Sequence, residues 1–214
     1  MHRQHLLNAL RFYFITDDTA PGCSPMDQAR IALQAGATMV QYRNKSYSDD
    51  FLAEIILIRE ICGEKDVPFI VNDHIRLAQR VSADGVHLGQ DDAAPGIARR
   101  ILGEGAIVGI SVSNPLELRS TDLSQCDYMG TGPVFPTGTK ADAKAVKGLA
   151  GLKEMVDLSP IPVVAIGGIT ADNADACFKS GAAGVAVISF ISRADDPFAN
   201  AVRLGKACGV PGVL

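Results

Sequence analysis

Short apolar runs alternate with amphipathic runs along the chain at roughly 20–25 residue intervals, the pattern of repeated strand–helix units. Several apolar runs are continuous rather than alternating: Phe69-Ile70-Val71, Val163-Val164-Ala165-Ile166 and Val185-Ala186-Val187-Ile188. Strands buried on both faces have this composition, so the pattern predicts a parallel sheet covered by helices. Eight such units in 214 residues predict a single-domain (β/α)8 TIM barrel.

The strands expected from this pattern are Arg11–Thr16, Thr38–Arg43, Pro68–Asn72, Asp84–Leu88, Ala106–Ser111, Asp127–Thr131, Pro162–Gly167 and Ala183–Ile188. The expected helices are Pro25–Ala35, Asp49–Gly63, Ile75–Arg80, Gly96–Leu102, a short one from Asn114, Gly148–Val156, Ala171–Ser180 and Asp196–Ala207. Residues 1–10 are expected to form a short helix that caps the bottom of the barrel, and no linker divides residues 1–214 into further domains.

A doubly wound open sheet is the alternative fold for this pattern. If such a sheet bound a dinucleotide, a Gly-rich turn would normally follow its first strand. The turn at this position, Asp17-Asp18-Thr19-Ala20, is not of that kind. The barrel is therefore the favoured architecture.

Charge and hydropathy exclude several classes of partner. The net charge is −4 with the charges spread out, so no basic stripe suggests nucleic acid and no charged tail suggests a membrane surface. No run of about 18 apolar residues and no signal-peptide pattern is present, so we expect a cytoplasmic protein with small-molecule substrates. The five cysteines are widely spaced, without a Cys-x-x-Cys pair, and are expected to be reduced thiols.

Polar residues gather where the predicted strands end, which is where TIM barrels place their active sites. Each one alone is also explained as a helix cap, a surface charge or a satisfied core histidine. Together they favour a site, because ordinary surface charges need not collect at one end of the strands. They are Gln41, Arg43, Lys45, Asn72, Asp73, His87, Asp92, Ser111, Thr137, Thr139, Lys140 and Ser189.

The mixture of charges points to a polyphosphate and a hard cation. Arg43, Lys45 and Lys140 supply three positive charges, and Asp73 and Asp92 supply two carboxylates on neighbouring strands. Mg2+ is typically bound by one or two carboxylates together with phosphate oxygens of the substrate. Asn72 and Ser111 can donate hydrogen bonds to further phosphate oxygens, whereas His87 is a poor choice for an ion that prefers oxygen.

A second anion site is expected after the seventh and eighth strands, at Gly167-Gly168 and at Ile188-Ser189, because these loops form the phosphate cradle common in such barrels. The alternative is that Gly167-Gly168 only makes a tight turn. The loop rich in Gly and Pro that ends at Thr137-Gly138-Thr139-Lys140 is expected to close over an anionic ligand. No catalytic triad or activated cysteine is evident, so the site suits the joining or splitting of two phosphorylated molecules, with pyrophosphate as the expected leaving group.

The sequence resembles the thiamine phosphate synthase family, in order along nearly the whole chain. The motifs that carry the resemblance are Gln41-Tyr42-Arg43-Asn44-Lys45, Asn72-Asp73, Ala83-Asp84-Gly85-Val86-His87-Leu88-Gly89-Gln90-Asp91-Asp92, Gly109-Ile110-Ser111, Gly130-Thr131-Gly132-Pro133-Val134-Phe135-Pro136-Thr137-Gly138-Thr139-Lys140, Val164-Ala165-Ile166-Gly167-Gly168-Ile169 and Gly184-Val185-Ala186-Val187-Ile188-Ser189. The Ile-Gly-Gly-Ile piece alone is shared by many phosphate-binding barrels.

The resemblance implies a transferase that joins hydroxymethylpyrimidine pyrophosphate to hydroxyethylthiazole phosphate, giving thiamine monophosphate and pyrophosphate. It also implies the roles of the site residues. Arg43, Lys45, Asn72, Ser111 and Lys140 would hold the pyrophosphate, and Asp73 and Asp92 would bind Mg2+. Gln41 and His87 would lie near the pyrimidine, and Thr137, Thr139, Gly168, Ile188 and Ser189 would bind the thiazole phosphate.

Two other functions fit the same fold. One is a thiazole tautomerase, a related enzyme that lacks the full pyrophosphate set, and the other is a barrel that binds thiamine phosphates without catalysis. The complete set of Arg43, Lys45, Asp73, Asp92 and Lys140 favours the synthase over both. The oligomeric state does not follow from the sequence.

Overall fold

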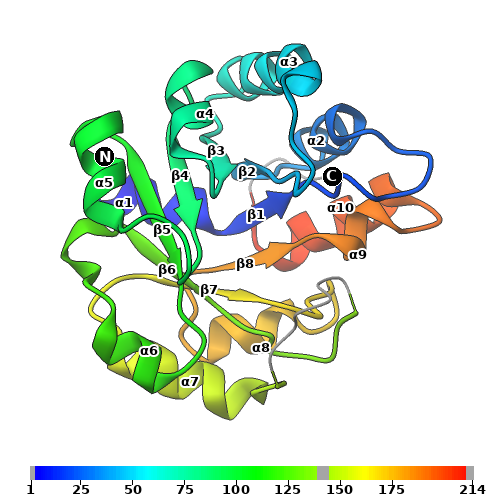
Figure 1. Ribbon diagram of the computed structural model, residues 1–214. Helices are drawn as coiled ribbons and strands as arrows, with labels where there is room; N and C mark the ends of the chain where they lie inside the picture. Colours follow the sequence, from blue (N-terminus) through cyan, green and yellow to red (C-terminus); the bar gives the residue numbers. More distant parts are fainter. Residues whose placement is uncertain (1–2, 139–144, 211–214) are drawn as a thin grey trace.

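The computed structural model describes residues 3–138 and 145–210. Its centre is a closed barrel of eight parallel strands arranged in chain order (Figure 1). The strands are β1 (Phe12–Ile15), β2 (Met39–Tyr42), β3 (Phe69–Asn72), β4 (Gly85–Leu88), β5 (Ile107–Ser111), β6 (Tyr128–Thr131), β7 (Val163–Ile166) and β8 (Gly184–Val187). Pairing of β1 with both β2 and β8 closes the barrel, so the predicted TIM-barrel fold is confirmed.

Helices form an outer layer around the barrel (Figure 1). They are α2 (Pro25–Gln34), α3 (Leu52–Gly63), α4 (Ile75–Arg80), α5 (Pro95–Leu102), α6 (Pro115–Ser120), α7 (Gly148–Leu158), α8 (Ala174–Lys179), α9 (Ser189–Ser192) and α10 (Pro197–Ala207). Two 3-10 turns, η1 (Asp49–Phe51) and η2 (Leu123–Gln125), precede α3 and β6. None of the helices in the described ranges combines the length and apolar character needed to cross a bilayer.

Successive residues of each strand face opposite sides of the barrel wall. Along β1, Phe12 and Phe14 pack outward against the helices, whereas Tyr13 and Ile15 belong to a separate cluster inside the barrel. The interior cluster also contains residues of every strand except β4. The strands are thus buried on both faces, as their continuous apolar sequences indicate.

The bottom of the barrel lies against α1 (Arg3–Leu10). Leu6, Ala9 and Leu10 of this helix are buried in the interior cluster. The end of α1 lies so close to β8 that a Cβ on Gly184 would be 1.7 Å from the carbonyl oxygen of Leu10. The opposite end of the barrel, where the strands end, is left for ligands.

The structure differs from the sequence expectations mainly in short helices. Residues Asp49–Phe51 form a 3-10 turn rather than the start of α3. The helix expected over Ala171–Ser180 covers Ala174–Lys179, and the eighth strand ends one residue early, so that Ser189 begins the unexpected helix α9. Four residues are too few to show helical periodicity, which explains why α9 was missed.

Candidate active site

A cavity of about 790 Å³ opens at the carboxyl ends of the strands. It is lined by every predicted site residue in the described ranges, namely Gln41, Arg43, Lys45, Asn72, Asp73, His87, Asp92, Ser111, Thr137, Gly168, Ile188 and Ser189. Thr139 and Lys140 lie outside the described residues. A second depression, of about 310 Å³, lies outside the barrel beside α6, and Arg119 is its one charged lining residue. The larger cavity is therefore the candidate active site.

Arg43 is the most deeply buried cation of this cavity, with 8% of its surface exposed. Its backbone is fixed to the end of β1, because its N–H donates to Oγ1 of Thr16 at 2.9 Å. Within the described ranges, however, the guanidinium donates to no oxygen atom. Its nitrogen atoms are open to the cavity, because Thr131 Oγ1 is the one side-chain polar atom in the described ranges that is both fully buried and without a partner. A guanidinium with unused donors binds carboxylate and phosphate oxygens well. The cavity beside Arg43 therefore favours an anion.

Two carboxylates line the cavity on neighbouring strand ends. Asp73 follows β3 and Asp92 lies in the loop after β4, and these strands pair directly through Asn72 and His87. Asp73 has a φ of 62°, a left-handed conformation that is uncommon for residues other than glycine. Oδ2 of Asp92 accepts a hydrogen bond from the N–H of Gly89 at 2.7 Å, which fixes the direction of its carboxylate.

These carboxylates have the chemistry that Mg2+ prefers. No group of three or more His, Cys, Asp or Glu side chains spaced to hold a metal ion occurs in residues 3–138 or 145–210. Mg2+ needs no such cluster, because it is usually bound by one or two carboxylates and by phosphate oxygens of the substrate. Asp73 and Asp92 fit that mode of binding.

A chain of hydrogen bonds crosses the inside of the barrel at the floor of the cavity. Nε2 of Gln41 lies 2.6 Å from the hydroxyl of Tyr13, which lies 2.8 Å from the hydroxyl of Tyr128. The Tyr128 hydroxyl is 3.0 Å from Nδ1 of His87, and Nε2 of His87 is 2.9 Å from Oγ of Ser111. Burial raises the pKa of both phenols well above their ordinary value, so they are neutral at physiological pH.

The middle of this chain depends on a glycine in β5. A Cβ at Gly109 would lie 2.2 Å from Cζ of Tyr128 and 2.6 Å from Nδ1 of His87. Any side chain at position 109 would therefore separate the phenol from the imidazole. The Gly109-Ile110-Ser111 segment thus supplies both the space for the chain and its last member.

The loop after β6 continues along β7 and closes one side of the cavity. The N–H groups of Val134 and Phe135 donate to the carbonyl oxygens of Ile166 and Gly167, each at 3.0 Å. Gly168 follows with a φ of 65°, and a Cβ there would lie 2.5 Å from the carbonyl oxygen of Pro136. This tight packing brings Thr137 and Gly168 to the same cavity.

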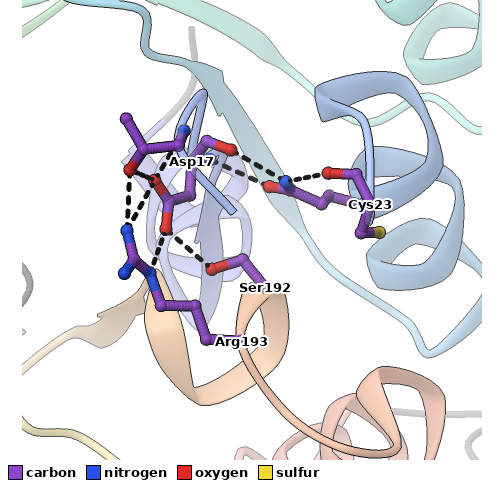
Figure 2. A network of polar contacts seen from close by, with 6 residues as sticks. Asp17, Cys23, Ser192 and Arg193 are labelled. Atoms are coloured by element: carbon purple, nitrogen blue, oxygen red, sulfur yellow. Dashed lines mark hydrogen bonds and ion pairs between the residues drawn. The ribbon is translucent and has the colours of Figure 1, made fainter. Parts of the chain in front are cut away.

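The loop after β1 is joined to α9 by an ion pair (Figure 2). Oδ2 of Asp17 accepts hydrogen bonds from Nε of Arg193 at 2.7 Å and from Oγ of Ser192 at 3.2 Å. Burial would raise the pKa of Asp17, but the hydrogen bonds from Arg193 and Thr19 outweigh it and hold the pKa below its ordinary value. Arg193 also lines the cavity, so the pair brings a further cation to the rim beside Ser189.

The same loop is also held by a buried glutamine of α2. Oε1 of Gln28 accepts from the N–H of Asp17 at 2.8 Å, and Nε2 of Gln28 donates to the carbonyl oxygens of Asp17 and Cys23 (Figure 2). All backbone partners of this amide lie in the loop between β1 and α2. The position of α9 is therefore tied, through Asp17, to the packing of α2.

The cysteines show no sign of catalytic activation. Cys62, Cys126, Cys177 and Cys208 are buried, and Cys23 is partly exposed. Burial raises the pKa of Cys62, Cys126 and Cys208 to about 12. A thiol with such a pKa is a poor nucleophile at neutral pH.

Tyr13, Tyr128, Asp17 and Arg193 were not among the predicted site residues. A signal for the tyrosines exists in the sequence, because a tyrosine within a buried strand needs a partner for its hydroxyl. No comparable signal exists for Arg193, whose placement depends on the unexpected helix α9. These residues extend the predicted site to the floor and rim of the cavity.

Comparisons with known proteins agree on one family. A family model described as thiamine monophosphate synthase matches residues 12–191. The thiamine-phosphate synthase of Bacillus velezensis is 39% identical over 216 aligned positions, with 96% of each chain covered. That of Chlorobium limicola is 43% identical over 185 positions, covering 86% of this chain and 87% of the relative.

Solved structures give the same result. The thiamine phosphate pyrophosphorylase from Pyrococcus furiosus superposes with a TM-score of 0.86 at 38% identity, covering 97% of this chain and 100% of that one. A 3-hexulose-6-phosphate synthase superposes with a TM-score of 0.68, covering 92% of this chain and 99% of that one. At 16% identity the second likeness shows the barrel fold alone.

Proposed function

The chain belongs to the thiamine monophosphate synthase family, and from that premise we propose that it joins hydroxymethylpyrimidine pyrophosphate to hydroxyethylthiazole phosphate, releasing pyrophosphate and thiamine monophosphate. The observation that supports the release of pyrophosphate is the Arg43 guanidinium, which lines the cavity and has no acceptor within the described residues. A pyrophosphate would supply the charge and the oxygen atoms that this group lacks.

The reaction breaks the bond between the pyrimidine methylene carbon and the pyrophosphate oxygen, and the electron pair leaves with the pyrophosphate. The ring nitrogen of the thiazole uses its lone pair to form the new carbon–nitrogen bond. No proton has to be removed from that nitrogen, so the protein mainly stabilises the leaving group. Arg43 and Lys45 line the cavity on the exit of β2 and would do so by charge, with Asn72 and Ser111 as neutral donors.

We assign Asp73 and Asp92 as the residues that would hold Mg2+. Their support is the donor set described above: two carboxylates on paired strand ends that line the same cavity as the cations. Bound there, Mg2+ would neutralise part of the pyrophosphate charge. The hydrogen bond from Gly89 would keep the Asp92 carboxylate directed in the absence of the ion.

The thiazole phosphate is assigned to the other side of the cavity. Thr137, Gly168, Ile188 and Ser189 line this side, at the ends of β6, β7 and β8. Backbone N–H groups of Gly168 and Ser189 are suited to bind phosphate oxygens, as in other barrels with a short helix after the eighth strand. Thr139 and Lys140 lie outside the described residues, and the family resemblance assigns Thr139 to the thiazole phosphate and Lys140 to the pyrophosphate.

A pyrophosphate-release assay with omitted components tests this function. Purified protein is incubated with Mg2+ and with both substrates, with either substrate alone, or with both substrates and excess EDTA. We expect release only in the complete mixture. Isomerisation of a thiazole phosphate without pyrophosphate release would support a tautomerase, and binding of thiamine phosphates without turnover would support a non-catalytic barrel. Either result would overturn the proposal.

A further inference from the structure

In the hydrogen-bond chain at the cavity floor, the donor and acceptor of every bond are determined once Gln41 is the donor to Tyr13. Nε2 of Gln41 donates to the Tyr13 hydroxyl at 2.6 Å. Within the described residues, the remaining partner of that hydroxyl is Tyr128 Oη at 2.8 Å. Tyr13 is 1% exposed, so its hydroxyl is shielded from water and must donate its hydrogen to Tyr128.

The direction continues through the imidazole. Tyr128 is fully buried, and its hydroxyl, having accepted from Tyr13, has one remaining partner among the described residues, Nδ1 of His87 at 3.0 Å. Nδ1 is therefore the acceptor. A neutral imidazole with Nδ1 as acceptor carries its hydrogen on Nε2, which then donates to Oγ of Ser111 at 2.9 Å.

The two ends of the chain consequently show opposite polarity to the cavity. Oε1 of Gln41 accepts no hydrogen bond from the described residues, and Gln41 lines the cavity. Oε1 must also be open to solvent. If it were fully buried it would be a buried polar atom without a partner, and in the described ranges Thr131 Oγ1 is the one side-chain atom of that kind. At the other end, the Ser111 hydroxyl has already accepted from His87 and keeps its hydrogen for the cavity.

We propose that Tyr13 and Tyr128 are positioning residues that couple the Gln41 amide to His87. With Nε2 of Gln41 as donor, they hold His87 as its Nε2–H tautomer, and the chain presents the carbonyl oxygen of Gln41 as an acceptor and the hydroxyl of Ser111 as a donor to the substrate. The inference rests on the proposed function, because a Gln41 carbonyl acceptor selects a pyrimidine that faces it with an amino group over one that faces it with a carbonyl. The amino group donates to Oε1 of Gln41, and a phosphate oxygen accepts from Ser111. The opposite orientation of the Gln41 amide would reverse every bond of the chain.

Nitrogen-15 NMR of the substrate-free protein measures the tautomer directly, and its outcome does not depend on whether the protein is a synthase. The sequence has four histidines, and loss of one signal in His87→Gln assigns His87. At about pH 8, above the ordinary histidine pKa, we expect Nε2 to be protonated and Nδ1 to show the shift of an unprotonated nitrogen. The Nδ1–H tautomer, or rapid exchange between the two, would overturn the inference.

Phenylalanine variants test the role of the phenols. In Tyr128→Phe, or in Tyr13→Phe if that variant folds better, we expect His87 to sample both tautomers. Tyr42→Phe is the matched control, because Tyr42 is equally buried and its hydroxyl accepts from Asn44 outside this chain. Identical His87 spectra in wild type, Tyr42→Phe and both chain variants would contradict the positioning role.

Kinetics of the same variants separate positioning from general damage. We expect Tyr128→Phe to raise the KM for the aminopyrimidine pyrophosphate about tenfold, the effect of one neutral hydrogen bond, and to leave the KM for the thiazole phosphate unchanged. In the same variant, the preference for the amino substrate over an analogue that carries a carbonyl in place of the amino group should fall. Equal changes in both KM values, or an unchanged preference, would count against the proposal.

Discussion

The carboxylate of Asp17 and the guanidinium of Arg193 form an ion pair at 2.7 Å that joins the loop after β1 to α9, across the seam where β1 pairs with β8. The Asp17 side chain is 4% exposed and that of Arg193 is 42% exposed, so one partner is shielded and the other borders the cavity. The pair therefore contributes to stability and to the shape of the site.

Acid should weaken the protein partly through Asp17. Its folded-state pKa is lowered, so its contribution is present above the unfolded pKa of about 3.9 and is lost as pH falls through the folded pKa. We expect Asp17→Asn to reduce the free energy of unfolding by about 1 kcal/mol at pH 7, after allowance for solvent screening, and by less at low pH. Urea unfolding at several pH values measures both effects.

A suitable control is Asp157→Asn, which removes an exposed ion pair with Lys153 on α7. Such pairs contribute little, so the control should unfold like the wild type at each pH. If Asp17→Asn shows the same pH dependence as the wild type, the low pKa of Asp17 has been assigned wrongly.

Removal of the Arg43 charge should impair the reaction far more than it impairs folding. We expect Arg43→Gln to lower kcat/KM by about 10²–10³, the range found when one donor that stabilises developing charge is lost. The melting temperature should stay near that of the wild type, because the guanidinium has no protein acceptor to lose among the described residues. Arg30→Gln, on the exposed side of α2, serves as the control. Similar rates for the two variants would remove Arg43 from the site.

Asp92 should affect Mg2+ dependence specifically. We expect Asp92→Asn to fold normally, because the amide oxygen of asparagine can still accept from the N–H of Gly89, and to need a much higher Mg2+ concentration for half-maximal rate. Rates measured across a Mg2+ titration test this. The neighbouring Asp91→Asn should show a smaller shift, and equal shifts in the two variants would point to a general charge effect.

Gly168 should matter because of space as well as backbone conformation. In Gly168→Ala the new methyl group would meet the carbonyl oxygen of Pro136 at 2.5 Å, so we expect the β6 loop to move and the KM for the thiazole phosphate to rise about tenfold. Gly22→Ala is the matched control, since Gly22 has a similar positive φ with nothing within 4 Å. If both variants keep wild-type KM values, the contact between Gly168 and the β6 loop does not shape the thiazole site.

The barrel could be predicted from the sequence because burial on both faces leaves a strong pattern. Runs such as Phe69-Ile70-Val71 and Val163-Val164-Ala165-Ile166 mark strands that contact both the interior and the helices. Helix ends were predicted less accurately, since capping and 3-10 turns shift them by a few residues. The four-residue helix α9 has too few residues to produce a pattern of its own.

The cavity lining was also predictable to a large extent, because charged groups at strand ends share one edge of a barrel. Gln41, Arg43 and Lys45 alternate along one extended segment and all reach the cavity. The contacts at the floor and rim of the cavity could not be predicted in this way. Tyr128 contacts Tyr13 and His87 across the barrel, and Asp17 contacts Arg193 near the far end of the chain. Contacts between residues so distant in sequence depend on closure of the barrel.

Quantification of both products is the most direct measurement of the central claim. Purified protein is supplied with hydroxymethylpyrimidine pyrophosphate, hydroxyethylthiazole phosphate and Mg2+, and thiamine monophosphate and pyrophosphate are measured over time. We expect the two products to appear in equal amounts and at equal rates, with Arg43→Gln slowing both together. Pyrophosphate released without thiamine monophosphate, or neither product formed, would contradict the assignment of this chain as a synthase.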